Sequence, residues 1–199
     1  MDIVLATRNK RKAEELKKIL KDAGIPIENI LTLQDFPHIP EVIEDGKTFE
    51  ENAIKKARTV AGYTGMITIA DDSGLEVDAL GGAPGVISAR YAVEGDDRAN
   101  NERLLREMED VPDDRRTARF VCCIAIASGD LVRTFHGYVN GRIGRRPVGD
   151  RGFGYDPLFY PEGYDRTFAE MTGDEKNRIS HRAMALKGLQ EYLRNTGMK

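Results

Sequence analysis

A short apolar run that leads directly into two aspartates is the feature that most constrains the fold of this chain. Residues 66–70 (MITIA) are apolar and partly β-branched, which predicts a strand that we expect to end at Asp71 and Asp72. Two neighbouring carboxylates repel each other unless a cation or a shifted proton neutralises one of them. A hard divalent cation such as Mg²⁺ takes oxygen ligands and brings phosphates with it. The alternative is a strand end whose aspartates cap the following turn.

The composition is that of a globular protein with a charged surface. The 199 residues suffice for one domain or two close lobes, and the apolar fraction of 40% supplies a core. The formal net charge is -3, so no overall field attracts nucleic acid or an anionic membrane. No apolar run approaches the roughly 20 residues that cross a bilayer. We therefore expect neither a nucleic-acid partner nor a membrane, and phosphate binding must come from a local cluster.

The two cysteines, Cys122 and Cys123, are adjacent in the sequence. Neighbouring strand residues point to opposite faces, so this pair is neither a disulfide framework nor a zinc site. We expect both to be small buried side chains. The first residues, MDIVLA, have no basic leader and soon run into charge, so no signal peptide is expected. The predicted location is the reducing cytosol (cytoplasmic).

A strand, a turn and a helix are predicted at the N-terminus. Residues 3–6 are an apolar run that residues 7–9 interrupt, and apolar residues then recur at helical spacing until Gly24. Thr7 and Asn9 therefore lie where a helix leaves N–H groups free. Such a helix end attracts phosphate through its unpaired donors and its dipole.

Three basic residues, Lys10, Arg11 and Lys12, occupy the first turn of this predicted helix. Cations are disfavoured at a helix N-terminus because the helix dipole is positive there. A bound polyanion would explain them, and a solvated basic turn is the alternative. The glycine pattern of a Walker loop is missing.

The rest of the chain alternates between helical and strand-like segments. Residues 25–47 are predicted to be irregular, and a capping box at Thr48 begins a helix that runs to about Ala61. The other predicted elements are a helix near residues 100–108, a hairpin of strands 118–127 and 131–139, a short strand at 158–160, a capping box at Thr172 and a C-terminal helix from Ser180.

Acidic residues precede the helix at Thr48. Glu44 lies near the start of that helix, where it could be a metal ligand, a neighbour of the cap or an exposed side chain. Glu41 and Asp45 flank it, and the sequence alone leaves open which of the three would be a second metal ligand.

An aromatic and glycine-rich loop spans residues 152–157 (GFGYDP). Such a loop can offer a ring for stacking and backbone groups for hydrogen bonds, although a packed turn without a ligand is equally compatible. Further on, Lys176, His181 and Arg182 would form a cluster of donors if Ser180 caps the last helix. Together with the acidic and basic motifs, these features are suited to a metal-bound nucleoside triphosphate.

Seven ordered motifs closely resemble those of the inosine triphosphatase family, also called noncanonical purine nucleoside triphosphate pyrophosphatases. The resemblance covers nearly the whole chain and rests on Thr7-Arg8-Asn9 through Lys12, Glu44 with Thr48-Phe49 and Glu51-Asn52-Ala53, residues 70–75, residues 81–86, Ser88-Ala89-Arg90-Tyr91, residues 152–157, and Ile179-Ser180-His181-Arg182. One position departs from the motif, because Arg11 stands where many members have glycine.

The resemblance implies a fold and an activity. The implied fold is a single α/β domain over residues 1–199 with two lobes, a long mixed β-sheet flanked by helices, and an active-site cleft between the lobes. The implied reaction is hydrolysis of ITP, dITP and XTP to the monophosphate and pyrophosphate, which removes deaminated purines from the nucleotide pool. It further implies a requirement for Mg²⁺ and a homodimer.

The resemblance also implies roles for single residues. Asp72 would be the catalytic residue and a metal ligand, with Glu44 as the second ligand, and the sequence does not separate a general base from a metal ligand at Asp72. The implied substrate contacts are Thr7, Arg8, Asn9, Lys10, Arg11, Lys12, Ser73, Phe153, Gly154, Tyr155, Asp156, Lys176, His181 and Arg182. How guanine would be excluded stays open.

Three other readings stay open at this point. Maf-like nucleotide pyrophosphatases also place an early basic motif beside acidic residues, but the motifs around Phe153 and His181 argue against them. A regulatory nucleotide-binding module would keep Lys12 and Phe153 but would need no acidic pair. A nucleic-acid-binding module is disfavoured by the net charge of -3 and by the lack of a long basic stripe.

Overall fold

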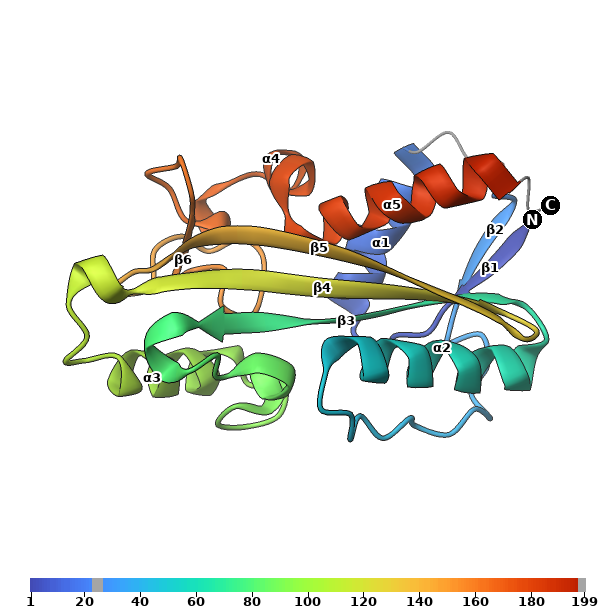
Figure 1. The fold of residues 1–199 in the computed structure, drawn as a ribbon, viewed down its shortest axis with the longest axis horizontal. Coiled ribbons are helices and arrows are strands. Elements are labelled where there is room, and N and C mark those ends of the chain that lie inside the picture. Colours follow the sequence, from blue (N-terminus) through green and yellow to red (C-terminus); the bar gives the residue numbers. More distant parts are fainter. Residues whose placement is uncertain (23–26, 197–199) are drawn as a thin grey trace. The chain divides into compact units, whose positions relative to one another are not determined.

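The structure, a computed structural model, describes residues 1–22 and 27–196 (Figure 1). Six strands form one sheet in the order β2-β1-β3-β4-β5-β6. The strands are β1 (Asp2–Leu5), β2 (Asn29–Thr32), β3 (Ile67–Val77), β4 (Thr117–Ser128), β5 (Leu131–Ile143) and β6 (Phe159–Pro161). The helices are α1 (Lys10–Asp22), α2 (Phe49–Thr64), α3 (Asp97–Glu107), α4 (Gly173–Ile179) and α5 (His181–Thr196). The α/β class that the sequence predicts is confirmed.

The sheet is mixed. Strand β1 pairs in parallel with both β2 and β3, with Ile3 opposite Ile67. Strands β4 and β5 are neighbours joined only by Gly129 and Asp130, a connection short enough only for antiparallel strands. Strand β6 pairs antiparallel with the end of β5. The hairpin and the mixed sheet that the sequence predicts are therefore present.

The chain divides into two compact units. The first unit comprises residues 1–72, 122–137 and 182–199, and the second comprises residues 73–121 and 138–181. Strands β3, β4 and β5 are long and contribute residues to both units. Each unit has its own hydrophobic core.

The core of the first unit lies between one face of the sheet and two helices. Leu16 and Leu20 of α1 pack with Leu186 and Leu189 of α5 over the buried strand residue Ile124. Helices α1 and α5 lie on the same side of the sheet and α2 lies on the other (Figure 1). The apolar spacing of α1 and α5 predicted these buried faces.

The core of the second unit is aromatic. The rings of Phe120 and Phe159 lie 4.7 Å apart, and those of Phe159 and Phe168 lie 5.3 Å apart. Leu104 and Met108 of α3 join the same cluster of buried residues. This cluster anchors α3 in the second unit.

Two predictions of element boundaries need correction, and a third cannot be compared with the described residues. Strand β2 lies in the stretch that the sequence predicted to be irregular, because only one short apolar run marks it. Helix α2 continues past Ala61 to Thr64 and ends at Gly65, whose φ of 67° is the left-handed conformation that terminates helices. The predicted stop of α1 at Gly24 lies outside the described residues.

The largest correction concerns Asp71 and Asp72. Strand β3 does not end at these residues but continues through both of them to Val77. The carboxylates are therefore part of a strand and not of a turn. The reading of them as caps of a following turn is wrong.

The predictions for the two cysteines and for the caps at Thr48 and Thr172 are confirmed. Cys122 and Cys123 are free thiols and both are fully buried. The Thr48 hydroxyl accepts a hydrogen bond from the Glu51 N–H and caps α2, and Thr172 makes a complete capping box at α4. Among the described residues, no helix has the length and apolar character needed to cross a membrane.

Leu16→Ala should destabilise the protein by about 2–5 kcal/mol, because Leu16 is fully buried and its loss leaves a cavity between α1 and the sheet. Chemical denaturation gives the free energy of unfolding. Glu14→Ala, an exposed position on the same helix, is the control and should change stability by less than about 0.5 kcal/mol. Equal effects of both changes would contradict the described packing of α1.

Candidate active site

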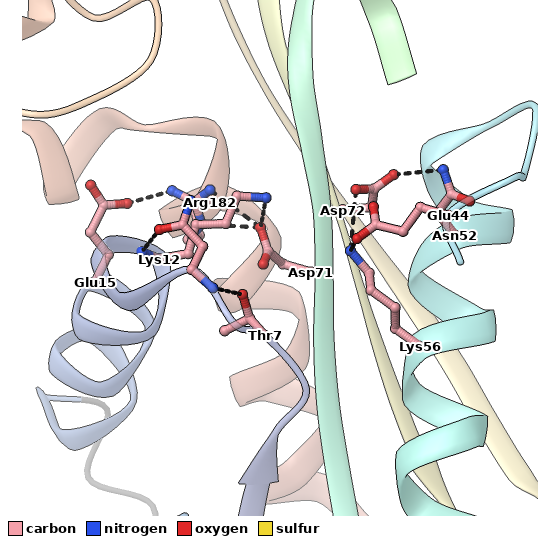
Figure 2. A network of polar contacts seen from close by, with 10 residues as sticks. Thr7, Lys12, Glu15, Glu44, Asn52, Lys56, Asp71, Asp72 and Arg182 are labelled. Carbon is pink, nitrogen blue, oxygen red and sulfur yellow. Dashed lines mark hydrogen bonds and ion pairs between the residues drawn. The ribbon is translucent and has the colours of Figure 1, made fainter. Parts of the chain in front are cut away.

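Asp71 and Asp72 point to opposite faces of β3 (Figure 2). Successive residues of a strand alternate between the two faces, so adjacent carboxylates in an uninterrupted strand are directed apart. The two carboxylates therefore do not interact with each other as the neighbouring pair that the sequence suggested. Each carboxylate instead meets its own set of partners, and the two sets differ in charge.

Asp71 is fully buried among cations. Its Oδ2 atom lies 3.2 Å from the Lys12 ammonium of α1 and 3.2 Å from Nη2 of Arg182 of α5. Arg182 also forms an ion pair with Glu15 of α1. Burial by itself disfavours the Asp71 carboxylate, but Lys12 and Arg182 outweigh it and hold its pKa well below the usual range. Asp71 therefore ties β3 to two helices as a permanent anion.

Asp72 lies against helix α2 on the other face. Its carboxylate accepts a hydrogen bond from the Asn52 amide at 3.1 Å and another from the Lys56 ammonium at 3.3 Å. The same ammonium lies 3.2 Å from the carboxylate of Glu44. Lys56 thus lies between the carboxylates of Glu44 and Asp72, which are 28 positions apart in the sequence. We call Glu44, Asn52, Lys56 and Asp72 the α2 cluster.

The α2 cluster has more negative than positive charge. Burial raises the pKa of Asp72 to about 6, although Lys56 and Lys12 oppose the shift, and the carboxylate of Glu44 adds to it. Burial also disfavours the Lys56 ammonium, but the carboxylates of Asp72, Asp71 and Glu44 raise its pKa. Lys56 therefore stays charged and Asp72 remains incompletely neutralised. A further cation would complete the charge balance.

Glu44 and Asp72 fit a hard divalent cation. Mg²⁺ takes oxygen ligands and is commonly bound by one or two carboxylates, the rest of its shell being water and substrate phosphates. Among the described residues, no group of three or more potential ligand side chains (His, Cys, Asp or Glu) is suitably placed for a metal ion. Two carboxylates such as Glu44 and Asp72 would leave the rest of the coordination shell to water and substrate phosphates.

The structure separates the three acidic candidates before α2. Glu44 lies at Lys56 and is half-buried, whereas Asp45 is exposed and pairs with Lys55 at 2.6 Å. Glu41 is exposed. Of these three, Glu44 is the residue placed with Asp72.

The N-terminal turn is organised by its own side chains. Asn9 caps α1, because its Oδ1 atom accepts a hydrogen bond from the Lys12 N–H at 3.1 Å. Thr7 Oγ1 accepts one from the Asn9 N–H at 3.2 Å. Arg8 donates to the carbonyl of Ile39 at 2.9 Å. Lys10 and Arg11 are exposed at the helix start, and Arg11 is accommodated there as an ordinary helical residue.

The aromatic loop lies in the second unit. The Asp156 carboxylate accepts a hydrogen bond from the Phe153 N–H at 2.9 Å and pairs with the Lys176 ammonium at 2.6 Å. That ammonium lies 4.6 Å from the centre of the Phe153 ring, and the buried Tyr155 donates to the carbonyl of Ser88. Asp156 is buried and holds the loop together.

Lys176, His181 and Arg182 do not share a common partner, in contrast to the donor cluster that the sequence predicted. Lys176 pairs with Asp156, Arg182 pairs with Asp71 and Glu15, and the His181 ring stacks on Phe120 at 4.8 Å. Their sequence proximity suggested one cluster, but the chain turns between α4 and α5 and directs them to different neighbours. Ser73 is half-buried in β3 beside Asp72.

Asn52, Lys56 and Glu15 were not predicted as site residues, although Asn52 belongs to one of the motifs that carry the family resemblance. Asn52 and Lys56 are four positions apart on α2, next to the apolar residues Ala53 and Ala57, and are therefore buried with them. A lysine and an asparagine beside the buried stripe of a helix were the available signal. Glu15 carries no comparable signal, because its partner Arg182 is remote in the sequence.

Fold and residues together define an α/β protein whose buried carboxylate–lysine cluster is suited to a divalent cation carrying phosphates. Its relatives place it more closely: the sequence model of the Ham1 family matches residues 3–192, and the chain belongs to that family. The family membership that the sequence motifs predicted is thereby confirmed.

Named relatives match almost the whole chain. A protein named dITP/XTP pyrophosphatase from Desulforamulus reducens is 53% identical over 195 residues, which cover 97% of this chain and 96% of the relative. A protein of the same name from Geobacter sulfurreducens is 52% identical over 193 residues and 96% of both chains.

Solved structures agree with the fold. The Ham1 protein of Staphylococcus aureus superposes with a TM-score of 0.87 at 40% identity and covers 98% of this chain and 100% of its own. A HAM1 protein from Coxiella burnetii also gives a TM-score of 0.87, at 41% identity, and covers 98% and 99% of the two chains. The mixed sheet with flanking helices is therefore the fold of this family.

Asp72→Asn should stabilise the metal-free protein at neutral pH. Because the pKa of Asp72 rises from 3.8 in the unfolded chain to about 6, the folded chain binds more protons between these values. Ionised Asp72 therefore lowers stability as the pH rises through this window, and asparagine mimics the neutral form. We expect the free energy of unfolding in EDTA to increase by about 1–3 kcal/mol near neutral pH, with the gain fading by about pH 4.

The neighbouring change Asp71→Asn is the matched control, because its sign is opposite. The pKa of Asp71 is lowered, so its carboxylate adds stability above its unfolded pKa, and its loss leaves Lys12 and Arg182 less compensated. The expected loss is about 3 kcal/mol or more at neutral pH. Denaturant titrations of both variants test the pair, and two changes of the same sign would refute the described environments.

Proposed function

We propose that this protein hydrolyses ITP, dITP and XTP to the nucleoside monophosphate and pyrophosphate, and so removes deaminated purines from the nucleotide pool. The observation that carries the proposal is the match, about half identical and nearly full-length, to proteins named dITP/XTP pyrophosphatases. The buried carboxylates of the α2 cluster supply the chemistry that such a reaction needs.

The α2 cluster would hold the metal. Asp72 and Glu44 would bind Mg²⁺, which when bound neutralises phosphate charge and polarises the phosphorus that is attacked. Asp72 orients the attacking water and takes its proton, which requires the ionised carboxylate that prevails above about pH 6. Asn52 and Lys56 hold that carboxylate in place.

The N-terminal turn would bind the triphosphate. The water attacks the α-phosphorus, the bond to the bridging oxygen breaks, and pyrophosphate leaves with that oxygen. Lys12, together with Thr7, Asn9 and the start of α1, offsets the charge that develops on the leaving pyrophosphate. Arg8, Lys10 and Arg11 would add to the positive field at this helix end.

The aromatic loop and the residues after it would bind the base. The ring of Phe153 is partly exposed and offers a stacking surface, and Gly154, Tyr155 and Asp156 shape the loop that carries it. Ser73 is proposed as a further substrate contact. Lys176, His181 and Arg182 supply donors that match an oxygen at position 6 of the purine. Adenine has an amino group there, and one unmatched buried donor lowers affinity by about 5- to 150-fold.

Wild-type protein should release pyrophosphate from ITP, dITP and XTP far faster than from ATP when Mg²⁺ is present. The measurement is a screen of common and deaminated triphosphates with pyrophosphate as the readout, in Mg²⁺ and in EDTA. Preferred cleavage of dTTP and UTP would favour a Maf-like enzyme instead. Binding of nucleotides without turnover in either condition would favour a regulatory module and would overturn the proposal.

Asp72→Asn should lower kcat for ITP by about 100-fold or more, because it removes both a proton acceptor and a metal ligand. Asp130→Asn, in the exposed turn between β4 and β5, is the control and should retain normal turnover. Near-normal kcat in the Asp72 variant would rule out the assigned role. Thermal unfolding of both variants shows that any loss of activity is not a loss of fold.

The proposal includes a compartment and an assembly. The cytosol is supported by Cys122 and Cys123, which are free thiols, as expected in a reducing compartment. A homodimer is proposed from the family resemblance.

A further inference from the structure

The start of helix α3 holds both hydrogen-bonding groups of one peptide unit in the aromatic loop. The Asp97 carboxylate accepts a hydrogen bond from the Gly154 N–H at 2.8 Å. The Asn101 amide donates one to the Gly154 carbonyl at 2.9 Å. Asp97 and Asn101 are four positions apart, so they lie on the same face of α3 and reach the loop together. We call these two residues the α3 clamp.

The loop needs such support because of its backbone. Gly154 has a φ of 61°, a left-handed conformation that residues other than glycine rarely adopt. A Cβ atom at this position would meet nothing within 4 Å, so close packing does not explain the glycine. The backbone conformation itself is what the position requires, and the α3 clamp fixes it from both sides.

The clamped peptide lies between two aromatic residues with different roles. Tyr155 is buried and its hydroxyl donates to the carbonyl of Ser88, which anchors one side. Phe153 is only partly buried, with Lys176 over its ring. Movement of the Gly154 peptide would therefore shift the exposed ring of Phe153 while Tyr155 stayed anchored.

Stability alone does not account for Asn101. The residue is buried, and its Oδ1 atom has no hydrogen-bond partner in the part of the chain that the structure describes. A buried acceptor without a donor lowers stability, so an apolar residue would suit this position better on packing grounds. Asparagine donates a hydrogen bond to the Gly154 carbonyl, and an apolar residue cannot do so.

We propose that Asp97 and Asn101 are positioning residues for purine recognition: they clamp the Gly154 peptide and thereby hold the Phe153 ring in the orientation that stacks on the base. This inference rests on the proposed function, in which Phe153 binds the base. Neither residue contacts substrate, so their effect is confined to the base end of the nucleotide. Binding of the phosphate chain does not depend on them.

The test compares four variants of the full-length protein. Asp97→Ala and Asn101→Leu remove the clamp from the N–H and the carbonyl side respectively. Asp97→Asn keeps an acceptor for the Gly154 N–H and serves as the rescue variant. Glu102→Ala changes an exposed residue of the same helix that pairs with Arg98, and it is the control.

Four quantities separate positioning from general damage to the fold. They are KM and kcat for ITP, the inhibition constant of inorganic tripolyphosphate, which has no base, and the calorimetric dissociation constant of inosine monophosphate. We expect both clamp variants to raise KM for ITP and to weaken inosine monophosphate binding by about 10-fold or more, because small misplacements of binding groups have large effects. The inhibition constant of tripolyphosphate should stay unchanged, every variant should remain folded at the assay temperature, and Asp97→Asn should recover most of the loss.

Two other outcomes would overturn the inference. One is unchanged KM and unchanged inosine monophosphate binding in both clamp variants. The other is an equal loss of affinity for tripolyphosphate and for inosine monophosphate, which would indicate damage to the whole protein. A wild-type protein that fails to cleave deaminated purine triphosphates would instead refute the proposed function, and the calorimetric dissociation constant of inosine monophosphate would still decide whether the clamp affects the base end.

Discussion

The alternation of Asp71 and Asp72 across strand β3 is the constraint on which the arrangement of charges depends. One residue faces Lys12 and Arg182, and its neighbour faces Lys56. Had the strand ended at these residues, both carboxylates would have shared one environment. Because the strand continues, two adjacent and identical side chains obtain opposite shifts of pKa. A structural anion and an incompletely neutralised carboxylate thus arise one residue apart.

Helix α2 sets the properties of the second carboxylate. Its N-terminal cap at Thr48 fixes where the helix begins, and this determines that Asn52 and Lys56 face the strand. The buried Asp72 carboxylate shares the single ammonium of Lys56 with Glu44. The positive charge beside Asp72 is therefore too small to neutralise both carboxylates. The same imbalance lowers the stability of the metal-free protein and, in the function that we propose, would favour a bound divalent cation. Reduced stability and metal binding would then have one physical origin.

Helix α3 plays a comparable part for the aromatic loop. The glycines that allow the loop its backbone conformation also leave it without side-chain packing of its own at Gly154. The loop is instead held by hydrogen bonds with Asp156, which lies within the loop, and with Asp97 and Asn101 of α3. If the loop binds the base as we propose, residues that do not touch the ligand would shape the surface that recognises it.

The sequence by itself determined the α/β class, the hairpin of β4 and β5, the caps at Thr48 and Thr172, and the family, because these follow from local periodicity, cap chemistry and ordered motifs. It also singled out Asp72 and Glu44, although their role in binding metal stays a prediction. It did not reveal that Asp71 pairs with Arg182 and Asp72 with Lys56, or that Lys176, His181 and Arg182 have separate partners. Only the tertiary structure decided these points, because burial and the facing charges of remote segments set each carboxylate's environment, and residue order along a strand contains neither.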